Sequence, residues 1–211
     1  MIFKDRRDAG KKLGEAVADK FQGTDPKNIV VISLLRGGIL VGYEVAKKLH
    51  AAHLPLVVTK ISSPQSEELA IGAVCYDITY LDRDIIQYVG NIPRPLIRHH
   101  IEEAQFIFED YVDRYMLDSI QYQKLIKGKT VVIVDDGIAT GASAKAAYLF
   151  LSTLKPKKVL IASPVMLGQV KIRDVEVVEL VPNAESGSVS QFYASFPQVE
   201  DEEILRLLKT S

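Results

Sequence analysis

Apolar residues follow two alternating patterns along this chain: short aliphatic runs, and longer stretches with an apolar position every three or four residues. The runs at 29–34 and 131–134 are rich in valine and isoleucine, and turn residues bound them. Such runs are typical of strands buried on both faces of a parallel sheet. The stretches "LPLVVTKI" and "KKVLIASPV" predict two further strands.

Helical patterns lie between the predicted strands. They cover residues 5–21, with Asp5 as the candidate N-cap, residues 37–49 and residues 142–154. Strands and helices that alternate at these lengths form βαβ units with right-handed crossovers. The pattern therefore predicts an α/β fold with a central, mostly parallel sheet flanked by helices.

Two segments fall outside this alternation. Residues 94–123 carry apolar side chains at spacings of mostly three and four, which predicts one long, inserted amphipathic helix. The C-terminal stretch combines a Ser/Gly-rich opening, an aromatic cluster and a short helix with Asp201 in its first turn, and it predicts a small hood over one sheet edge. We therefore divide a single domain, 1–211, into a core at about 1–90 and 128–166, a helical insertion at about 93–125 and a hood at about 167–211.

Composition and charge exclude several classes of function. The 211 residues are 47% hydrophobic and carry a formal net charge of -1, so the chain can bury one core but has no overall charge for nucleic acid or an anionic membrane. No apolar run is long enough to span a membrane, and the single cysteine, Cys75, cannot form an internal disulfide. The four histidines lack partners at metal-ligand spacing, and we expect them at helix ends or on the surface. We expect a cytoplasmic protein without a membrane or nucleic-acid partner.

The stretch "VVIVDDGIATGAS", residues 131–143, carries the candidate chemistry. Ligands of an open parallel sheet lie beyond the carboxyl ends of the strands, so Asp135 and Asp136 should lie at the rim of the crevice. The loop that follows, 137–141, precedes a helix and offers backbone N–H groups to an anion, while Thr140 and Ser143 add hydroxyl donors. Carboxylates that accept hydroxyl hydrogens beside an anion-binding loop suit a sugar diol and a phosphate, as in ribose 5-phosphate.

Spacing excludes two other phosphate-binding motifs. A Walker loop requires lysine and then Ser or Thr after its last glycine, whereas Gly141 is followed by Ala142 and Ser143. The spacing of Gly137 and Gly141 does not match a dinucleotide fingerprint either. The remaining alternative is a polar strand end that turns tightly into a helix, but turn chemistry alone does not require two adjacent carboxylates.

The same stretch resembles the ribosyl-5-phosphate signature of the type I phosphoribosyltransferases. The likeness covers most of the chain, because "DRRDAGKKLGEAVA", "LLRGGILVGYEVAKKL", "ELAIGAV" and "QFYASFPQVEDEEI" are similar to stretches of a bacterial and archaeal branch of predicted phosphoribosyltransferases without an established acceptor. The resemblance implies the type I phosphoribosyltransferase fold, with Asp135 and Asp136 as the catalytic pair. It also implies that residues 137–143 bind the 5-phosphate, namely Gly137, Ile138, Ala139, Thr140, Gly141, Ala142 and Ser143.

The resemblance further implies a pyrophosphate loop at Leu35, Arg36, Gly37 and Gly38, and a basic residue at Lys60 that faces the pyrophosphate. The residues support this interpretation, because two glycines permit close approach of an oxyanion and Arg36 can engage two phosphate oxygens. An ordinary strand-to-helix turn with a solvated arginine, and a surface lysine, are the alternatives. The resemblance also implies Mg²⁺ as the cofactor. The ion arrives bound to the substrate rather than to a set of protein ligands, and Asp135 is the one candidate for direct contact with it.

Two positions depart from the family pattern. Relatives place a mobile loop after the basic residue and often bring a cation from it to the leaving group, whereas the segment 62–74 offers Ser62, Ser63, Glu67 and Glu68 but no Lys, Arg or His. Ala139 stands where purine-salvage relatives carry an aspartate that handles the base proton. The first departure disfavours efficient transfer, and the second disfavours a purine handled in that way.

We predict an enzyme that transfers the phosphoribosyl group of 5-phosphoribosyl 1-diphosphate to an unknown nitrogenous acceptor and releases pyrophosphate. A non-catalytic sensor of that ligand, or of a nucleotide, is the main alternative, and hydrolysis or phosphorolysis of a nucleotide is a third. Phe192, Tyr193 and Phe196 are candidates for stacking on a planar acceptor or, alternatively, form the core of the hood. The apolar stripe from Ile97 to Tyr122 needs a covering surface, and we expect a homodimer.

Overall fold

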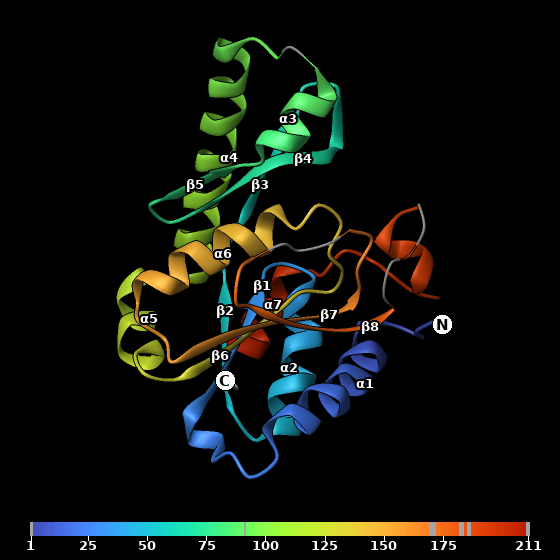
Figure 1. Ribbon diagram of the computed structural model, residues 1–211, viewed down its shortest axis with the longest axis vertical. Coiled ribbons are helices and arrows are strands. Elements are labelled where there is room, and N and C mark those ends of the chain that lie inside the picture. The colour runs from blue at the N-terminus through green and yellow to red at the C-terminus, as the bar shows by residue number, and fades with distance from the viewer. Residues whose placement is uncertain (1, 91, 169–171, 182–183, 185–186, 210–211) are drawn as a thin grey trace.

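The centre of the protein is a five-stranded parallel sheet (Figure 1), seen in a computed structural model that describes residues 2–90, 92–168, 172–181, 184 and 187–209. The strand order is β2-β1-β6-β7-β8, and every neighbouring pair is parallel. The strands are β1 (Ile29–Leu34), β2 (Ala52–Leu56), β6 (Thr130–Val134), β7 (Lys158–Val165) and β8 (Glu176–Val181). The predicted α/β fold with a mostly parallel central sheet is confirmed.

Helices cover both faces of this sheet because its strands are apolar on both sides. One face packs on α1 (Arg6–Ala18) and α2 (Gly38–Leu49), through residues such as Val31 of β1 and Val132 of β6. The other face packs on α5 (Ser119–Ile126) and α6 (Ala142–Thr153) through the intervening strand residues. Two short 3₁₀ turns, Asp19–Phe21 and Pro26–Asn28, connect α1 to β1.

A second, antiparallel sheet forms a lobe that projects from one end of the molecule (Figure 1). Its strands are β3 (Thr59–Ser63), β4 (Ser66–Cys75) and β5 (Ile78–Leu81), and it is accompanied by α3 (Arg83–Val89) and α4 (Arg94–Tyr115). An ion pair joins the lobe to the core: Lys145 Nζ of α6 lies 2.9 Å from Asp82 Oδ2, and Tyr80 donates its hydroxyl to the same oxygen.

The structure corrects three predictions in this region. The stretch "LPLVVTKI" is not one strand, because the chain leaves β2 at Leu56 and enters β3 of the other sheet at Thr59. The segment 62–74 is not a long loop, because it forms a hairpin whose strands pair from Thr59↔Val74 to Ser63↔Ser66. Residues 94–123 form two helices: Met116 adopts a left-handed conformation at the end of α4, and Asp118 caps α5.

The apolar stripe of the inserted segment is covered by its own chain. Phe108 and Tyr115 of α4 pack in a cluster with residues of β3, β4 and α7 (Asp201–Leu208), and Tyr122 of α5 is buried against the central sheet. The stripe therefore does not require a second subunit to cover it. Cys75 is buried in the core, where it packs as a small apolar side chain.

The C-terminal part is more than a hood. The range assigned to it, about 167–211, includes β8 of the central sheet. The hood itself comprises the 3₁₀ turn Val189–Phe192, the aromatic segment after it and α7. Tyr193 pairs with Phe3 in an isolated parallel bridge, so the hood is attached to the N-terminal segment. Within the part of the chain that the structure describes, no helix has the length and apolar character needed to cross a membrane.

Candidate functional site

The carboxyl ends of β1 and β6 bring the two predicted loops into direct contact. A methyl group added at Gly37 would lie 1.9 Å from Asp136 Oδ2, and one added at Gly38 would lie 3.1 Å from Asp135 Oδ1. Only glycine permits this approach of the 35–38 loop to the acidic pair, because any Cβ would displace a carboxylate or its backbone. The 35–38 loop and the acidic pair therefore lie side by side, as expected for segments that follow two adjacent parallel strands.

Local hydrogen bonds shape the loop that follows β6. Asp136 donates its backbone N–H to Asp135 Oδ1 at 2.9 Å, and Ile138 donates its own to the carbonyl of Val165 at 2.9 Å. The amide of Ile138 is thus used by the fold and not offered to a ligand. Gly141 precedes α6 with φ 78°, a left-handed conformation that glycine adopts at no steric cost.

A small cavity of about 20 Å³ lies in this loop. It is lined by Lys60, Ala70, Asp135 and the backbone and side chains of residues 137–144, so it collects all seven residues predicted to bind the 5-phosphate. A cavity of this volume holds about one water molecule, so it is smaller than a phosphoribosyl group. Asp135 borders the cavity, whereas Asp136 does not.

The two carboxylates differ in their electrostatic surroundings. Burial, and then the charge of Asp136, raise the pKa of Asp135 well above its usual range, and the Lys60 ammonium opposes that shift. Asp136 instead forms an ion pair with Arg6, whose Nε lies 2.6 Å from Asp136 Oδ2. The acidic pair thus consists of one carboxylate at the cavity and one neutralised by an arginine.

Arg6 is the residue that sequence reasoning missed. It lies on α1, far from Asp136 along the chain, and its Nη1 also donates to the carbonyl of Pro197 at 2.6 Å. Its guanidinium stacks 3.6 Å above the ring of Phe196. One signal was available: Arg6 falls on the same helical face as Ala9 and Leu13, where an unpaired charge is costly and therefore predicts a buried partner.

The side chain of Arg36 does not line the cavity of the 137–144 loop. Its Nε donates to the carbonyl of Val199 at 3.0 Å, its Nη2 lies 3.0 Å from Asp201 Oδ1, and its guanidinium lies 5.8 Å from the centre of the Tyr111 ring. In this conformation Arg36 ties the 35–38 loop to α7 and α4. The glycine backbone of that loop, rather than its arginine, faces the acidic pair.

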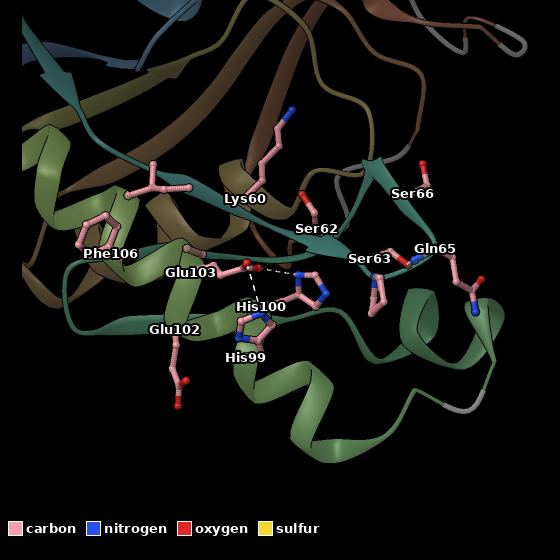
Figure 2. Close-up of a pocket in the computed structure, with 13 residues that line it drawn as sticks. Lys60, Ser62, Ser63, Gln65, Ser66, His99, His100, Glu102, Glu103 and Phe106 are labelled. Carbon is pink, nitrogen blue, oxygen red and sulfur yellow. Dashed lines mark hydrogen bonds and ion pairs between the residues drawn. The ribbon is translucent and has the colours of Figure 1, made fainter.

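Lys60 lies between this cavity and a second, larger cleft of about 980 Å³ in the lobe. The cleft lies between the β3–β4 hairpin and α4, and Figure 2 shows that Lys60 extends away from the histidines on α4. His99 and His100 both contact Glu103, at 3.3 and 3.0 Å. Ser62 and Ser63 line the cleft, whereas the side chains of Glu67 and Glu68 lie outside the described part of the structure.

The hood aromatics pack against one another, with Tyr193 buried and Phe192 and Phe196 half-buried. Tyr193 lies 5.4 Å from Phe3 and 4.6 Å from Phe196 between ring centres, and its hydroxyl donates to the backbone carbonyl of Asp136. Burial raises the pKa of Tyr193, so the phenol stays a neutral donor. With Phe192 packed against the same cluster, these side chains form the core of the hood, the alternative allowed by the sequence.

The histidines divide between surface and core. His53 lies in β2, where its Nε2 is 2.7 Å from Ser33 Oγ, and burial lowers its pKa to about 4. The expectation of a helix-end or surface position is therefore wrong for His53, because the strand it belongs to begins at Ala52. Across the residues that the structure describes, no group of three or more His, Cys, Asp or Glu side chains is placed to hold a metal ion.

Comparison with protein families matches residues 3–185 of this chain to the phosphoribosyl transferase domain. Two proteins of Mycobacterium tuberculosis, from strains CDC 1551 and H37Rv and each named "Putative phosphoribosyl transferase", are 34% identical over 222 residues. The match covers 98% of this chain and 46% of each relative, so the chain spans about half the length of these curated relatives.

Solved structures show the same fold. The crystal structure of TT1426 from Thermus thermophilus aligns with a TM-score of 0.71 and 31% identity, covering 99% of this chain and 98% of that chain. The AQ2163 protein from Aquifex aeolicus aligns with a TM-score of 0.50 and 16% identity over 83% of this chain and 74% of that chain, a similarity of fold alone.

Proposed function

Since the chain belongs to the phosphoribosyl transferase domain family, we propose that it binds 5-phosphoribosyl 1-diphosphate and transfers the phosphoribosyl group to a nitrogenous acceptor, releasing pyrophosphate. One observation carries this proposal: Asp135, Lys60 and the 137–143 loop border the same cavity. A carboxylate, an ammonium and an anion-binding loop at one point suit the hydroxyls and phosphates of that compound.

The proposed reaction is a displacement at the ribose C1 carbon. The acceptor nitrogen forms the new bond to C1 while the bond from C1 to the pyrophosphate oxygen breaks, its electron pair leaves with pyrophosphate, and the proton of the acceptor passes to solvent. Because the ring gains positive charge, Asp135 supports it electrostatically in its ionised form, which the Lys60 ammonium favours, and it accepts a ribose hydroxyl. The protein contributes position and charge rather than a covalent intermediate.

The remaining predicted residues divide the phosphates between them. The loop 137–143 receives the 5-phosphate, with Thr140 and Ser143 as hydroxyl donors and the N-terminus of α6 behind them. Lys60 and the backbone of Gly37 and Gly38 receive the pyrophosphate. Arg36 contributes by holding that loop against α7, through its bonds to Val199 and Asp201.

Mg²⁺ fits this site as an ion carried by the substrate. Mg²⁺ is commonly bound by one or two carboxylates and substrate phosphates rather than by a cage of protein ligands. Asp135 supplies such a carboxylate beside the cavity, while the described side chains offer no larger cluster of metal ligands. When bound, the ion neutralises the negative charge of the leaving pyrophosphate.

The residues around the site say less about the part that would bind the nitrogenous acceptor than about the part that would bind the phosphates. Ala139 has no acidic side chain and cannot take a base proton, and the hood aromatics are occupied by their own packing. The β3–β4 hairpin offers serines and no arginine toward its tip. These features favour an acceptor that needs no protein base, and they are also the observation that favours the alternative of a non-catalytic sensor.

We place a homodimer interface on the outward face of α4. Phe106 and Ile107 are 74% and 45% exposed there, whereas the inward face is covered by the chain itself. Adjacent exposed aromatic and aliphatic side chains on a helix, which here also line the cleft of the lobe, suit a symmetric contact between two copies. The buried Cys75 thiol suits a reducing compartment such as the cytoplasm.

Incubation of the purified protein with 5-phosphoribosyl 1-diphosphate, Mg²⁺ and a pool of nitrogenous bases tests the proposal. We expect release of pyrophosphate together with consumption of one base. Release of pyrophosphate without loss of a base indicates hydrolysis, and binding without turnover indicates the sensor. Absence of both binding and turnover contradicts the proposed function.

A further inference from the structure

An ion pair from the first helix lies beneath the proposed ribosyl site. Arg6 Nε and Asp136 Oδ2 are 2.6 Å apart, and the side chains are 8% and 15% exposed. A pair this buried is costly to form unless its geometry and remaining hydrogen bonds are good. Arg6 meets that condition, because its Nη1 donates to the Pro197 carbonyl and its guanidinium stacks on Phe196.

The pair lies where three separate segments meet. A methyl group on Gly37 would lie 1.9 Å from Asp136 Oδ2 and 3.1 Å from Arg6 Nε, so the proposed pyrophosphate loop rests directly on the pair. On its other side the hood contributes the Pro197 carbonyl, and Tyr193 donates its hydroxyl to the backbone carbonyl of Asp136. Arg6 therefore joins α1, the acidic pair and the hood at one point.

The same arrangement makes the two adjacent acids unequal. Asp135 borders the cavity of the 137–144 loop together with Lys60, whereas Asp136 is absent from the residues that line it. The Oδ2 atom of Asp136 is already occupied by Arg6. A ribose hydroxyl entering the cavity thus meets the carboxylate of Asp135 and not that of Asp136.

We propose that Arg6 is the positioning residue of this site: it neutralises Asp136 and ties it to the hood, so that Asp136 is an anchor and Asp135 is the carboxylate that accepts the ribose hydroxyls. The inference rests on the proposed function and refines it, because sequence alone assigned the hydroxyls to both acids. Arg6 does not touch the substrate in this assignment. Its effect passes through Asp136 and through the loop that rests on it.

Calorimetric titration with ribose 5-phosphate, and with the diphosphate and Mg²⁺, separates these roles. Arg6→Gln and Asp136→Asn should each weaken binding about ten- to hundredfold, because each leaves a buried charge without its partner. The double variant, Arg6→Gln with Asp136→Asn, should bind within about tenfold of the parent, since removing both partners of a buried pair can be nearly neutral. Arg6→Lys should restore most of the affinity, because it keeps the positive charge.

Arg7→Gln is the matched control. Arg7 is the next residue on α1, but its guanidinium pairs with Glu44 and Glu203, away from the acidic pair. We expect its affinity for both ligands to equal that of the parent. If Arg6→Gln behaves like Arg7→Gln, or if Arg6→Lys binds as weakly as Arg6→Gln, the positioning role is wrong. If the double variant is folded but loses binding altogether, Asp136 itself is a ligand group and the proposal fails. This comparison does not depend on whether the single variants fold.

A readout without ligand keeps this inference separate from the proposed function. Hydrogen exchange of the free protein should become faster in Arg6→Gln over residues 35–38 and 193–197 together, and should stay unchanged over β3 to β5. If the parent binds neither phosphoribosyl compound, the proposed function fails, while coupled exchange of these two segments still supports the link made by Arg6. Unchanged exchange in both segments contradicts it.

Discussion

The parallel core and the antiparallel lobe meet at the candidate site but contribute to it very differently. The core supplies the acidic pair, the 35–38 loop and the 137–143 loop, all at the carboxyl ends of strands in the central sheet. The lobe supplies Lys60 and Ala70 at the edge of the cavity, and it holds the large cleft beside α4. We infer that the core recognises the ribosyl group and the 5-phosphate, while the lobe adds the charge of Lys60 at the pyrophosphate and sets what else can bind.

A largely buried ion pair in each region offers a direct comparison. In the core, Asp136 pairs with Arg6; at the attachment of the lobe, Asp82 pairs with Lys145 at 2.9 Å, with side chains 9% and 15% exposed. Because the two pairs resemble each other in distance and burial, breaking them should have similar effects on folding. Only the first pair should affect ligand binding.

The largest predicted effect follows from breaking these pairs. Asp136→Asn and Asp82→Asn should each lower the free energy of unfolding by about 3–5 kcal/mol, because each leaves a buried cation unpaired. Asp136→Asn should also weaken binding of ribose 5-phosphate, whereas Asp82→Asn should leave that affinity within about threefold of the parent. Urea denaturation and calorimetric titration measure the two quantities, and equal losses of affinity would remove the distinction between core and lobe.

Two tightly packed glycines, Gly37 in the core and Gly72 in the lobe, offer a second comparison of the two regions. An added methyl group would lie 1.9 Å from Asp136 Oδ2 in Gly37→Ala and 2.2 Å from the Tyr80 carbonyl in Gly72→Ala. Both substitutions overpack their surroundings, so each should lower the free energy of unfolding by about 3 kcal/mol.

The two alanine variants should differ in function. Gly37→Ala should abolish measurable binding of the diphosphate, because the added methyl group displaces the carboxylate on which the loop rests. Gly72→Ala should retain binding of ribose 5-phosphate. Equal affinity of the Gly37→Ala variant and the parent would show that the 35–38 loop is not part of the site.

The core should also show a pH dependence that comes from His53. Burial lowers its pKa to about 4, against about 6.5 in an unfolded chain. Between these values the unfolded state binds the proton and the folded state does not, so stability falls as the pH decreases through this window.

The size of this effect follows from the width of the window. At about 1.4 kcal/mol per pH unit, His53 should lower the free energy of unfolding by about 2 kcal/mol between pH 7 and pH 5. His53→Gln keeps a hydrogen-bonding partner for Ser33 Oγ. It should remove the contribution of His53 to the slope of the free energy of unfolding against pH. Identical slopes in the variant and the parent contradict the assignment.

The smallest predicted effect on stability concerns the outer face of α4. Phe106→Ser should change the free energy of unfolding by less than about 0.5 kcal/mol, because the side chain is 74% exposed. Its near neighbour Phe108 faces inward, and Phe108→Ser should cost about 3 kcal/mol or more.

Sedimentation of the same protein tests the dimer. The parent should sediment as a dimer at micromolar concentration, and Phe106→Ser together with Ile107→Ser should yield monomers that remain folded. A monomeric parent contradicts the dimer, and a dimeric double variant places the interface elsewhere. Substitution of Phe108 and Tyr115 would not serve this purpose, because both side chains pack within the chain.

Most of the core could be predicted from the sequence because its signals are local, and only β8 was missed, in the range assigned to the hood. The run Ile29–Leu34 is buried throughout and the acidic pair follows β6 directly, so periodicity and turn residues were sufficient. The lobe was mispredicted for the opposite reason. Its hairpin from Thr59 to Cys75 depends on pairing across a short turn, and the brief break at Met116 preserves the helical spacing on both sides.

The candidate site was predictable only in part. The 137–143 loop and Asp135 could be named as candidates because they follow the carboxyl end of β6, where ligands of an open parallel sheet bind. The partner of Asp136 could not, because Arg6 reaches it only when α1 and the hood pack against each other. The actual contacts of Arg36 likewise depend on the position of α7, which no local pattern encodes.

Titration of ribose 5-phosphate into the parent and into Asp135→Asn tests the central claim most directly. The substitution keeps the size of the side chain and replaces the ionisable carboxyl at the cavity by an amide, and it should preserve the fold while weakening binding about ten- to hundredfold. Saturable binding to the parent with this loss in the variant is the predicted result. Equal affinity of the two proteins, or no binding to the parent, would contradict a ribosyl phosphate site at the end of β6.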